Sequence, residues 1–283
     1  MPIIDRKPDP GSEGVRMSFG DHLEELRRRV LRAVLFAGLM LAVCLLLQDS
    51  IFAFISRPFY QAVELANQVR LEENGYLGQG RSYEDALALA RRTRPDILIE
   101  ARFRQIAPAE AFMGYLTVAL YASIFFSSPY ILYQIWLFVS AGLYAKERRM
   151  ALLYAPASLL LFVVGIAFGY CFMIPWGLKY FFMYADPKLV DPGTTLTTYL
   201  EFFLQMTVIF GAIFELPLVM MFMSWIGLIS PKTYGSHRRL AIVLILAVAA
   251  VITPPDPFSQ ILVAVPLYAL YEVGILLARI KHR

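Results

Sequence analysis

The sequence predicts an integral membrane protein of the all-α class, with six transmembrane helices and both termini in the cytoplasm. Of its 283 residues, 58% are hydrophobic and only 17% are charged, which is far from the composition of a soluble globular domain. Apolar segments with few charges recur along the chain at lengths that can cross a bilayer. Lysine and arginine residues gather in alternate connections between these segments, and this bias sets the orientation of the helices.

The chain begins with a polar leader, which we expect to be disordered over residues 1–17 because prolines and glycines interrupt it. The membrane domain then occupies residues 18–283. Its first part predicts a short amphipathic helix on the membrane surface, because apolar residues recur there at helical spacing. These residues are Phe19, Leu23, Leu26 and Val30. The helix leads directly into the first span, at about residues 30–48.

Five further spans are expected at about residues 112–140, 151–175, 202–228, 239–252 and 257–278. The span at 239–252 is the shortest, and an apolar run of its length is also typical of re-entrant segments. We count it as a span because the basic C-terminal tail would otherwise lie outside the cell. The basic residues that define the cytoplasmic side follow alternate spans and comprise Lys146, Arg148, Arg149, Lys232, Arg238, Arg239, Arg279, Lys281 and Arg283.

The connection between the first two spans is much longer than the others. Residues 56–110 hold many charges of both signs and include a run of helical character from Tyr83 to Arg92. We predict an enlarged extracytoplasmic loop here, since long loops are translocated largely regardless of their charge. It is expected to form a small cap with one or two helices, and partial disorder is the alternative.

The sequence disfavours an enzyme. It contains no nucleophile elbow, no zinc-protease motif, no phosphate-binding glycine loop and no dinucleotide fingerprint. Cys44 and Cys171 lie in apolar runs without a cysteine or histidine at ligand spacing, so we expect no disulfide, no metal site and no cofactor. A net charge of +4, scattered along the chain, argues against a nucleic-acid partner.

Glu215 is the most informative single residue, because it places a carboxyl group in the middle of the fourth span. Such a group costs several kcal/mol unless it is protonated, paired or in contact with water. Pro217 removes a backbone donor two residues later and is expected to kink the helix. One interpretation is a protonated Glu215 bonded to a neighbouring helix, and the other is a functional polar group. A proton-coupled secondary transporter that uses Glu215 is therefore an alternative function.

Acidic residues also occur in the basic cytoplasmic segments. Glu24 and Glu25 each lie four residues before an arginine, Arg28 and Arg29, which predicts ion pairs along one helix. Glu147 lies within a basic run and would balance its charge. Acids that meet on one cytoplasmic face are also suited to accept bidentate contacts from the guanidinium groups of a ligand.

Four segments, taken in order, resemble the TatC family, the large polytopic subunit of the twin-arginine protein translocase. They are His22-Leu-Glu-Glu-Leu-Arg-x-Arg29, the run from Ser128 through Phe138 to Arg149, Phe214-Glu-Leu-Pro217, and Thr253-Pro-Pro-Asp-Pro-Phe-Ser-Gln260. The resemblance extends over most of the chain. It implies a concave, glove-like bundle of six helices in the bacterial inner membrane.

The resemblance also implies a function. Members of this family bind the twin-arginine signal peptides of folded cargo at their cytoplasmic face. They organise small single-span partners, TatA and TatB, into a complex that contains several copies of the subunit and uses the proton-motive force. The resemblance implies no cofactor and no catalytic residue.

Site residues follow by matching the motifs. Glu25 and Glu147 resemble the acids that engage the paired arginines, and Arg27 and Phe138 resemble residues that support this site. Glu215 resembles the polar group that meets the partner subunits within the membrane, together with Thr253 and Gln260. The resemblance gives a structural role to Pro58, Pro217 and Asp256. The central part of the long loop, within 59–110, matches no motif, and we assign it no function.

Overall fold

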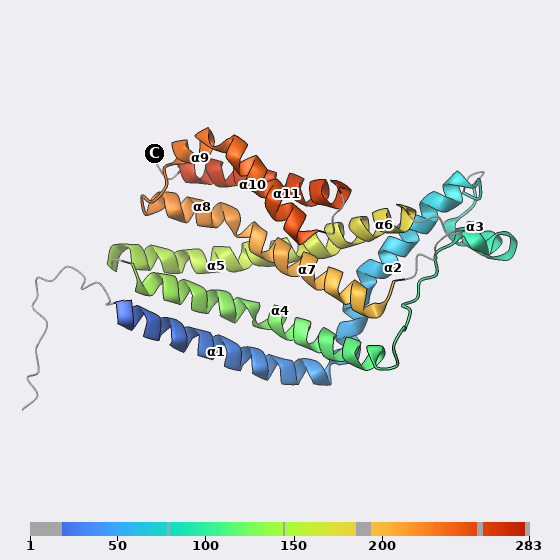
Figure 1. Cartoon of the computed structure of the whole chain (residues 1–283), viewed down its shortest axis with the longest axis horizontal. Helices are drawn as coiled ribbons and strands as arrows, with labels where there is room; N and C mark the ends of the chain where they lie inside the picture. Colours follow the sequence, from blue (N-terminus) through green and yellow to red (C-terminus); the bar gives the residue numbers. More distant parts are fainter. Residues whose placement is uncertain (1–18, 78–79, 144, 185–193, 254–256, 281–283) are drawn as a thin grey trace, which may run out of the picture.

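The computed structural model describes residues 19–77, 80–143, 145–184, 194–253 and 257–280. These residues form helices and contain no β-strand apart from an isolated bridge between Arg104 and Thr195. The helices lie side by side along the long axis of the molecule, and a smaller helical region projects at one end (Figure 1). In chain order they are α1 (Phe19–Leu46), α2 (Gln48–Glu73), α3 (Tyr83–Thr93), the 3₁₀ turn η1 (Pro95–Ile97), α4 (Glu110–Ala141), α5 (Ala145–Phe168), the π-helical turn η2 (Gly169–Met173), α6 (Ile174–Tyr184), α7 (Leu196–Phe214), α8 (Leu216–Trp225), α9 (Pro231–Ser236), α10 (Arg238–Ile252) and α11 (Pro257–Ile280).

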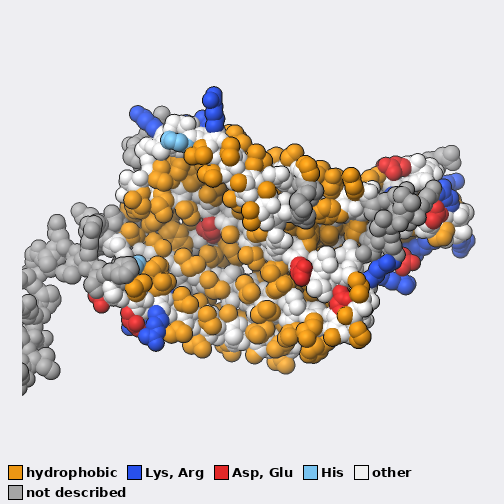
Figure 2. Space-filling view, in the orientation of Figure 1, with side chains coloured by type: hydrophobic (Ala, Val, Ile, Leu, Met, Phe, Trp, Pro, Cys, Tyr) orange, Lys and Arg blue, Asp and Glu red, His pale blue; other side chains and the backbone are white. Residues whose placement is uncertain are grey.

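The all-α membrane class is confirmed. Five helical segments in the described part of the chain are long and apolar enough to cross a membrane, and they are Gly20–Leu46, Glu110–Ala141, Tyr154–Tyr184, Leu196–Trp225 and Pro257–Ile280. Each coincides with a predicted span. The remaining predicted span, at 239–252, is the helix α10 of 15 residues. Figure 2 shows a hydrophobic surface over the body of the molecule, with most charged side chains gathered toward its two ends.

The predicted surface helix and the first span form one continuous helix, α1. This helix packs along α4, and most of its residues are exposed. Cys44 is buried where α1 meets Ala119 and Ala122 of α4. The single well-packed neighbour leaves most of the α1 surface to the surrounding lipid or to another protein.

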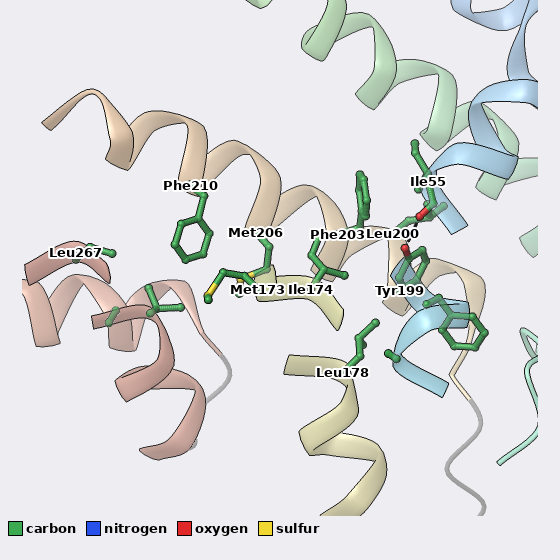
Figure 3. Packing of buried hydrophobic residues seen from close by; sticks show 14 of the residues in the cluster. Ile55, Met173, Ile174, Leu178, Tyr199, Leu200, Phe203, Met206, Phe210 and Leu267 are labelled. Carbon is green, nitrogen blue, oxygen red and sulfur yellow. Dashed lines mark hydrogen bonds between the residues drawn. The ribbon is translucent and has the colours of Figure 1, made fainter. Parts of the chain in front are cut away.

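The main hydrophobic core forms where α2, α6 and α7 meet. Phe59, Tyr199 and Phe210 are almost completely buried in it. The Tyr199 hydroxyl donates a hydrogen bond to the backbone carbonyl of Ile55, so that the polar end of a buried ring is satisfied across two helices (Figure 3). This core fixes α2 against the membrane helices.

The α5 and α7 helices approach each other so closely that only glycine fits at their contact. A Cβ atom on Gly165 would lie 2.4 Å from the carbonyl oxygen of Phe210. A Cβ atom on Gly211 would lie 2.7 Å from the ring of Phe162. Small residues allow such close backbone packing in membranes, where dispersion contacts hold helices together.

Two helices change their winding immediately before a proline. The α7 helix ends at Phe214, α8 begins at Leu216, and Pro217 follows at the second residue of α8, which confirms the predicted kink. The π turn η2 likewise precedes Pro175 at the second residue of α6. Proline cannot donate to the preceding turn and its ring clashes with the carbonyl four residues earlier, so a break or a widened turn relieves the contact. Before the π turn α5 packs on α7, and after it α6 packs on α2.

The segment predicted as the long loop, residues 56–110, begins inside a helix. Residues 56–73 belong to α2, where Arg57, Glu64, Glu72 and Glu73 are exposed and Arg70 is buried. The helical run expected over 83–92 is α3.

Two buried side chains of α2 are bonded to the backbone of other segments. The Asn67 amide pairs with the backbone of Ile99, donating to its carbonyl at 3.1 Å and accepting from its N–H at 2.8 Å. The buried Arg70 donates to the carbonyls of Ile97, at 3.3 Å, and Phe182, at 2.7 Å.

Candidate functional site

The predicted signal-peptide residues lie at one end of the bundle, where α1 begins and α4 ends. The two helices run side by side in opposite directions, so that the first turns of α1 meet the last turns of α4 (Figure 1). The α5 helix starts directly after α4, at the same end of the molecule. This packing joins motifs that are more than one hundred residues apart in the sequence.

Glu25 forms the centre of this site. Arg29, one turn later on α1, donates from Nε to Glu25 Oε1 at 2.6 Å. The Nη1 group of Arg29 also donates to the Oε1 atom of Gln134 on α4, at 3.2 Å. The side chains of Glu25 and Arg29 are only 13% and 18% exposed, and Gln134 is buried. The predicted ion pair between Glu25 and Arg29 is thus confirmed, and it is tied to a second helix.

Phe138 lies one turn beyond Gln134 and stacks on the ring of His22. The ring centroids are 4.4 Å apart with an angle of 21° between the planes. A Cβ atom on Gly142 would lie 3.3 Å from Cε1 of His22, so the imidazole fits against a position without a side chain. Within the described residues the buried Nδ1 atom of His22 has no hydrogen-bond partner. An aromatic stack thus joins α1 to α4, with His22 three residues before Glu25 and Phe138 four residues after Gln134.

Arg27 lies on another side of α1. It pairs with Glu24 at 3.5 Å, and both side chains are mostly exposed. The predicted pair between Glu24 and Arg28 is wrong, because Arg28 instead lies 4.0 Å from Oε2 of Glu25.

Glu147 belongs to the first turn of α5. Its side chain lies outside the described residues, as do the basic side chains beside it. Its backbone position places it shortly after the turn that joins α4 to α5, at the same end of the bundle as Glu25 (Figure 1).

Glu215 lies at the break between α7 and α8, in a second polar position. It is partly buried, and in the described part of the chain its Oε1 atom makes no hydrogen bond. Ser158 of α5 is its polar neighbour, and the buried hydroxyl of Ser158 also lacks a hydrogen bond there. Glu215 and Ser158 thus lie close together in the membrane helices, and neither Glu215 Oε1 nor Ser158 Oγ makes a hydrogen bond of normal geometry in the described part of the chain. Such groups are expensive in lipid unless another molecule satisfies them.

An aromatic cluster lies between these two polar positions. Trp136 of α4, Tyr154 of α5 and Phe222 of α8 are buried together with Leu218. The rings of Trp136 and Phe222 meet edge to face, with centroids 5.4 Å apart. The cluster fixes α4, α5 and α8 relative to one another and so holds the geometry of both positions.

The other predicted residues lie away from Glu25. Thr253 caps the end of α10 and donates to the carbonyl of Ala249 at 2.9 Å. Gln260 of α11 donates to the carbonyl of Leu246 on α10 at 3.0 Å, which joins the two helices. Pro58 and Pro217 are fully buried. Asp256 lies outside the described residues.

The sequence does not predict the packing partners of several polar residues. Glu272 accepts two hydrogen bonds from Arg238, at 2.6 and 2.8 Å, and one from Tyr268 at 3.0 Å. Gln134 and His22 lie within the motifs that resemble the TatC family, so the sequence offered a reason to consider them as site residues. Ser158 carries no such signal, since a serine in an apolar helix is common. The described residues contain no group of three or more metal-ligating side chains.

Comparisons with known proteins identify the family. The family model of the Sec-independent protein translocase protein TatC matches residues 21–266. The TatC protein of Desulforapulum autotrophicum is 31% identical over 268 residues, which cover 95% of this chain and 86% of that protein. The TatC protein of Listeria innocua is 31% identical, with 93% and 92% coverage.

A solved structure agrees with these relatives. The crystal structure described as the twin-arginine translocase receptor TatC superposes with a TM-score of 0.70 and 26% identity, covering 93% of this chain and 100% of that one. The chain thus belongs to the TatC family, and is a non-enzymatic membrane subunit of a Sec-independent protein translocase.

Proposed function

We propose that this chain is the receptor and scaffold of a twin-arginine translocase, and that it binds signal peptides at the Glu25 site. The observation that carries the proposal is the shielded Glu25 carboxylate, one helical turn after the His22 ring that stacks on Phe138. A carboxylate in a partly desolvated site binds a planar guanidinium group by two charge-assisted hydrogen bonds. An ammonium group is more strongly hydrated and lacks the fork, so the site favours arginine over lysine. In this proposal Glu147 supplies the second acid, and Arg27 and Phe138 border the peptide.

Replacing Glu25 by glutamine should weaken the binding of a twin-arginine signal peptide by roughly 30-fold, which corresponds to about 2 kcal/mol for a charge-assisted contact. The measurement is the fluorescence anisotropy of a labelled peptide with the purified chain in detergent. A twin-lysine peptide should bind the wild-type chain far more weakly. Glu147→Gln should weaken the twin-arginine peptide to a similar degree.

Glu24→Gln is the matched control, because Glu24 is the neighbouring acid on α1 and is 57% exposed. It should change the affinity by less than about twofold, as expected for an exposed charge. Equal losses in Glu24→Gln and Glu25→Gln would mean that the peptide responds only to net charge. That result would contradict the assignment of Glu25.

We also propose that the chain has six spans with both termini in the cytoplasm of a bacterium, and that it resides in the inner membrane. The basic residues after the second, fourth and sixth predicted spans support this orientation. The same peptide should then bind to sealed inside-out membrane vesicles. Binding only to right-side-out vesicles would reverse the proposed orientation.

Glu215 is proposed as a contact for TatA- and TatB-like single-span subunits. Its Oε1 atom and the Ser158 hydroxyl are unsatisfied in the described chain, and both lie in membrane helices. A partner helix with an amide or hydroxyl side chain at this depth would supply the missing hydrogen bonds. We further propose that several copies of the chain assemble in the complex, with Thr253 and Gln260 shaping the nearby docking edge.

Replacing Glu215 by leucine should have opposite effects on the isolated chain and on the complex. Removal of an unsatisfied polar group should raise the free energy of unfolding of the purified chain by about 1–3 kcal/mol. The yield of single-span partners that copurify should fall at least about tenfold, equivalent to about 1.4 kcal/mol. Thermal denaturation and copurification from membranes measure the two effects.

Glu201→Leu is the control, because Glu201 is an exposed acid on the same helix, α7. It should leave the copurified yield unchanged. If Glu215→Leu copurifies the single-span partners in the same yield as the wild type, Glu215 does not contact them. No contact among the described residues favours the alternative function, a proton-coupled transporter. Glu215→Leu distinguishes the two functions in an assay of the chain without its partners. A transporter would show solute-driven proton flux there and lose it in Glu215→Leu, whereas a receptor would show none in either chain.

A further inference from the structure

The Glu25 carboxylate already holds a guanidinium group, that of Arg29. The Nε atom of Arg29 lies 2.6 Å from Glu25 Oε1, and its Nη2 atom pairs with the same oxygen. Both side chains are more than four-fifths shielded from solvent. Ion pairs at exposed positions are weak because water and salt screen them, whereas a shielded pair is screened much less. An arginine from outside therefore meets a carboxylate that is occupied.

Gln134 gives the same guanidinium group a second anchor. Its Oε1 atom accepts from Arg29 Nη1 at 3.2 Å, and its side chain is only 4% exposed. The contact comes from α4, so it does not depend on the geometry of α1 alone. If Arg29 leaves Glu25, this acceptor remains, and the displaced guanidinium keeps a hydrogen bond. Such an arrangement lowers the cost of exchanging one guanidinium for another on Glu25.

We propose that Arg29 is an intramolecular blocker of Glu25, which an arginine of the signal peptide displaces when it binds. This inference rests on the proposed function of Glu25 as the acceptor for that arginine. The apparent dissociation constant then equals the intrinsic constant divided by the fraction of molecules in which Glu25 is free. The same factor applies to every ligand that needs Glu25.

The blocker therefore sets a threshold for binding and leaves the relative affinities of different peptides unchanged. A twin-arginine peptide binds above this threshold, because its guanidinium groups replace the bonds that Arg29 gives up. The affinity for a twin-lysine peptide is reduced by the same factor. Because its intrinsic affinity is lower, the reduced affinity falls below the threshold. The discrimination at a working concentration is sharper than the carboxylate alone would provide.

Arg29→Gln tests the blocker in the full-length chain in detergent, with the labelled twin-arginine and twin-lysine peptides as probes. The variant should bind both peptides more tightly, each by roughly tenfold, which corresponds to about 1.4 kcal/mol. The ratio of the two dissociation constants should stay unchanged. Arg29→Lys keeps the charge but loses the fork, and should tighten binding by a smaller factor.

Arg28→Gln is the matched control, because Arg28 is the adjacent residue, carries the same charge and is 58% exposed at 4.0 Å from Glu25 Oε2. It corrects for the repulsion between α1 and a cationic peptide, and should change affinity by less than about twofold. If Arg29→Gln weakens the binding of the twin-arginine peptide, or tightens it no more than Arg28→Gln does, the blocking role of Arg29 is contradicted while the proposed function stands. If neither the wild-type chain nor any variant binds the peptide, the proposed function is overturned and the blocker with it. Should Arg29→Gln fail to fold, the Arg29→Lys affinities decide by the same criteria.

Discussion

Replacing Gly165 by alanine is expected to reduce the free energy of unfolding by about 3 kcal/mol, at the upper end of the cost of overpacking a core. The added Cβ atom would lie 2.4 Å from the Phe210 carbonyl oxygen and 2.8 Å from the Phe214 Cβ atom. A backbone carbonyl cannot rotate away as a side chain can, so α5 and α7 must separate. Separation would also disturb the break at Glu215, which directly follows Phe214. Thermal denaturation of the purified chain measures the loss.

Gly38→Ala provides the control for this change. Gly38 lies on α1, and a Cβ atom there would meet nothing within 4 Å. Alanine at this exposed helical position should be neutral or slightly stabilising, because it favours the helix more than glycine does. If Gly165→Ala denatures at the same temperature as Gly38→Ala, the close contact between α5 and α7 is not as tight as described.

Arg70→Met is expected to lower the free energy of unfolding by about 2–4 kcal/mol and to loosen the region that carries α3. The substitution removes the hydrogen bonds to the carbonyls of Ile97 and Phe182 and leaves both without this donor. Methionine fills a similar volume, so the lost hydrogen bonds dominate the effect. Limited proteolysis should cut the chain near α3 faster than in the wild type, while the membrane helices stay intact.

Arg57→Met is the matched variant, since Arg57 is an exposed arginine on the same helix, α2. It removes the same charge without removing either of these two bonds, and its rate of cleavage near α3 should match that of the wild type. Faster cleavage in both variants would attribute the effect to charge. Unchanged cleavage in Arg70→Met would show that the Asn67 pair and the buried contact of Leu71 with Ala86, Ala90 and Ile97 hold this region to α2 without Arg70.

The membrane helices were predictable because long apolar runs leave few alternatives to a helix in a bilayer. The kink at Pro217 followed from the chemistry of proline. The extent of α2 over residues 56–73 could not be predicted, because exposed charges of both signs on this segment are also typical of a loop. Only its packing against α6 and α4 shows that the other face is buried.

The candidate site was predictable in part. The pairing of Glu25 with Arg29 follows from a spacing of four residues on one helix. The contact between Arg29 and Gln134 bridges 105 positions and depends on how far α1 slides along α4, which no local pattern records. The same holds for Ser158 and Glu215, whose proximity results from the packing of α5 on α8.

The π-helical turn at Gly169–Met173 makes the packing of α6 depend on the number of residues in the turn. Such a turn contains one residue more than an α-helical turn would, and each residue rotates an α-helix by about 100°. The α6 helix, which follows this turn, packs on α2. A deletion of one residue in this turn would rotate the buried Ile174, Leu178 and Phe182 away from the core, although no core residue had been replaced. At this point of the chain, the number of residues carries as much structural information as their identity.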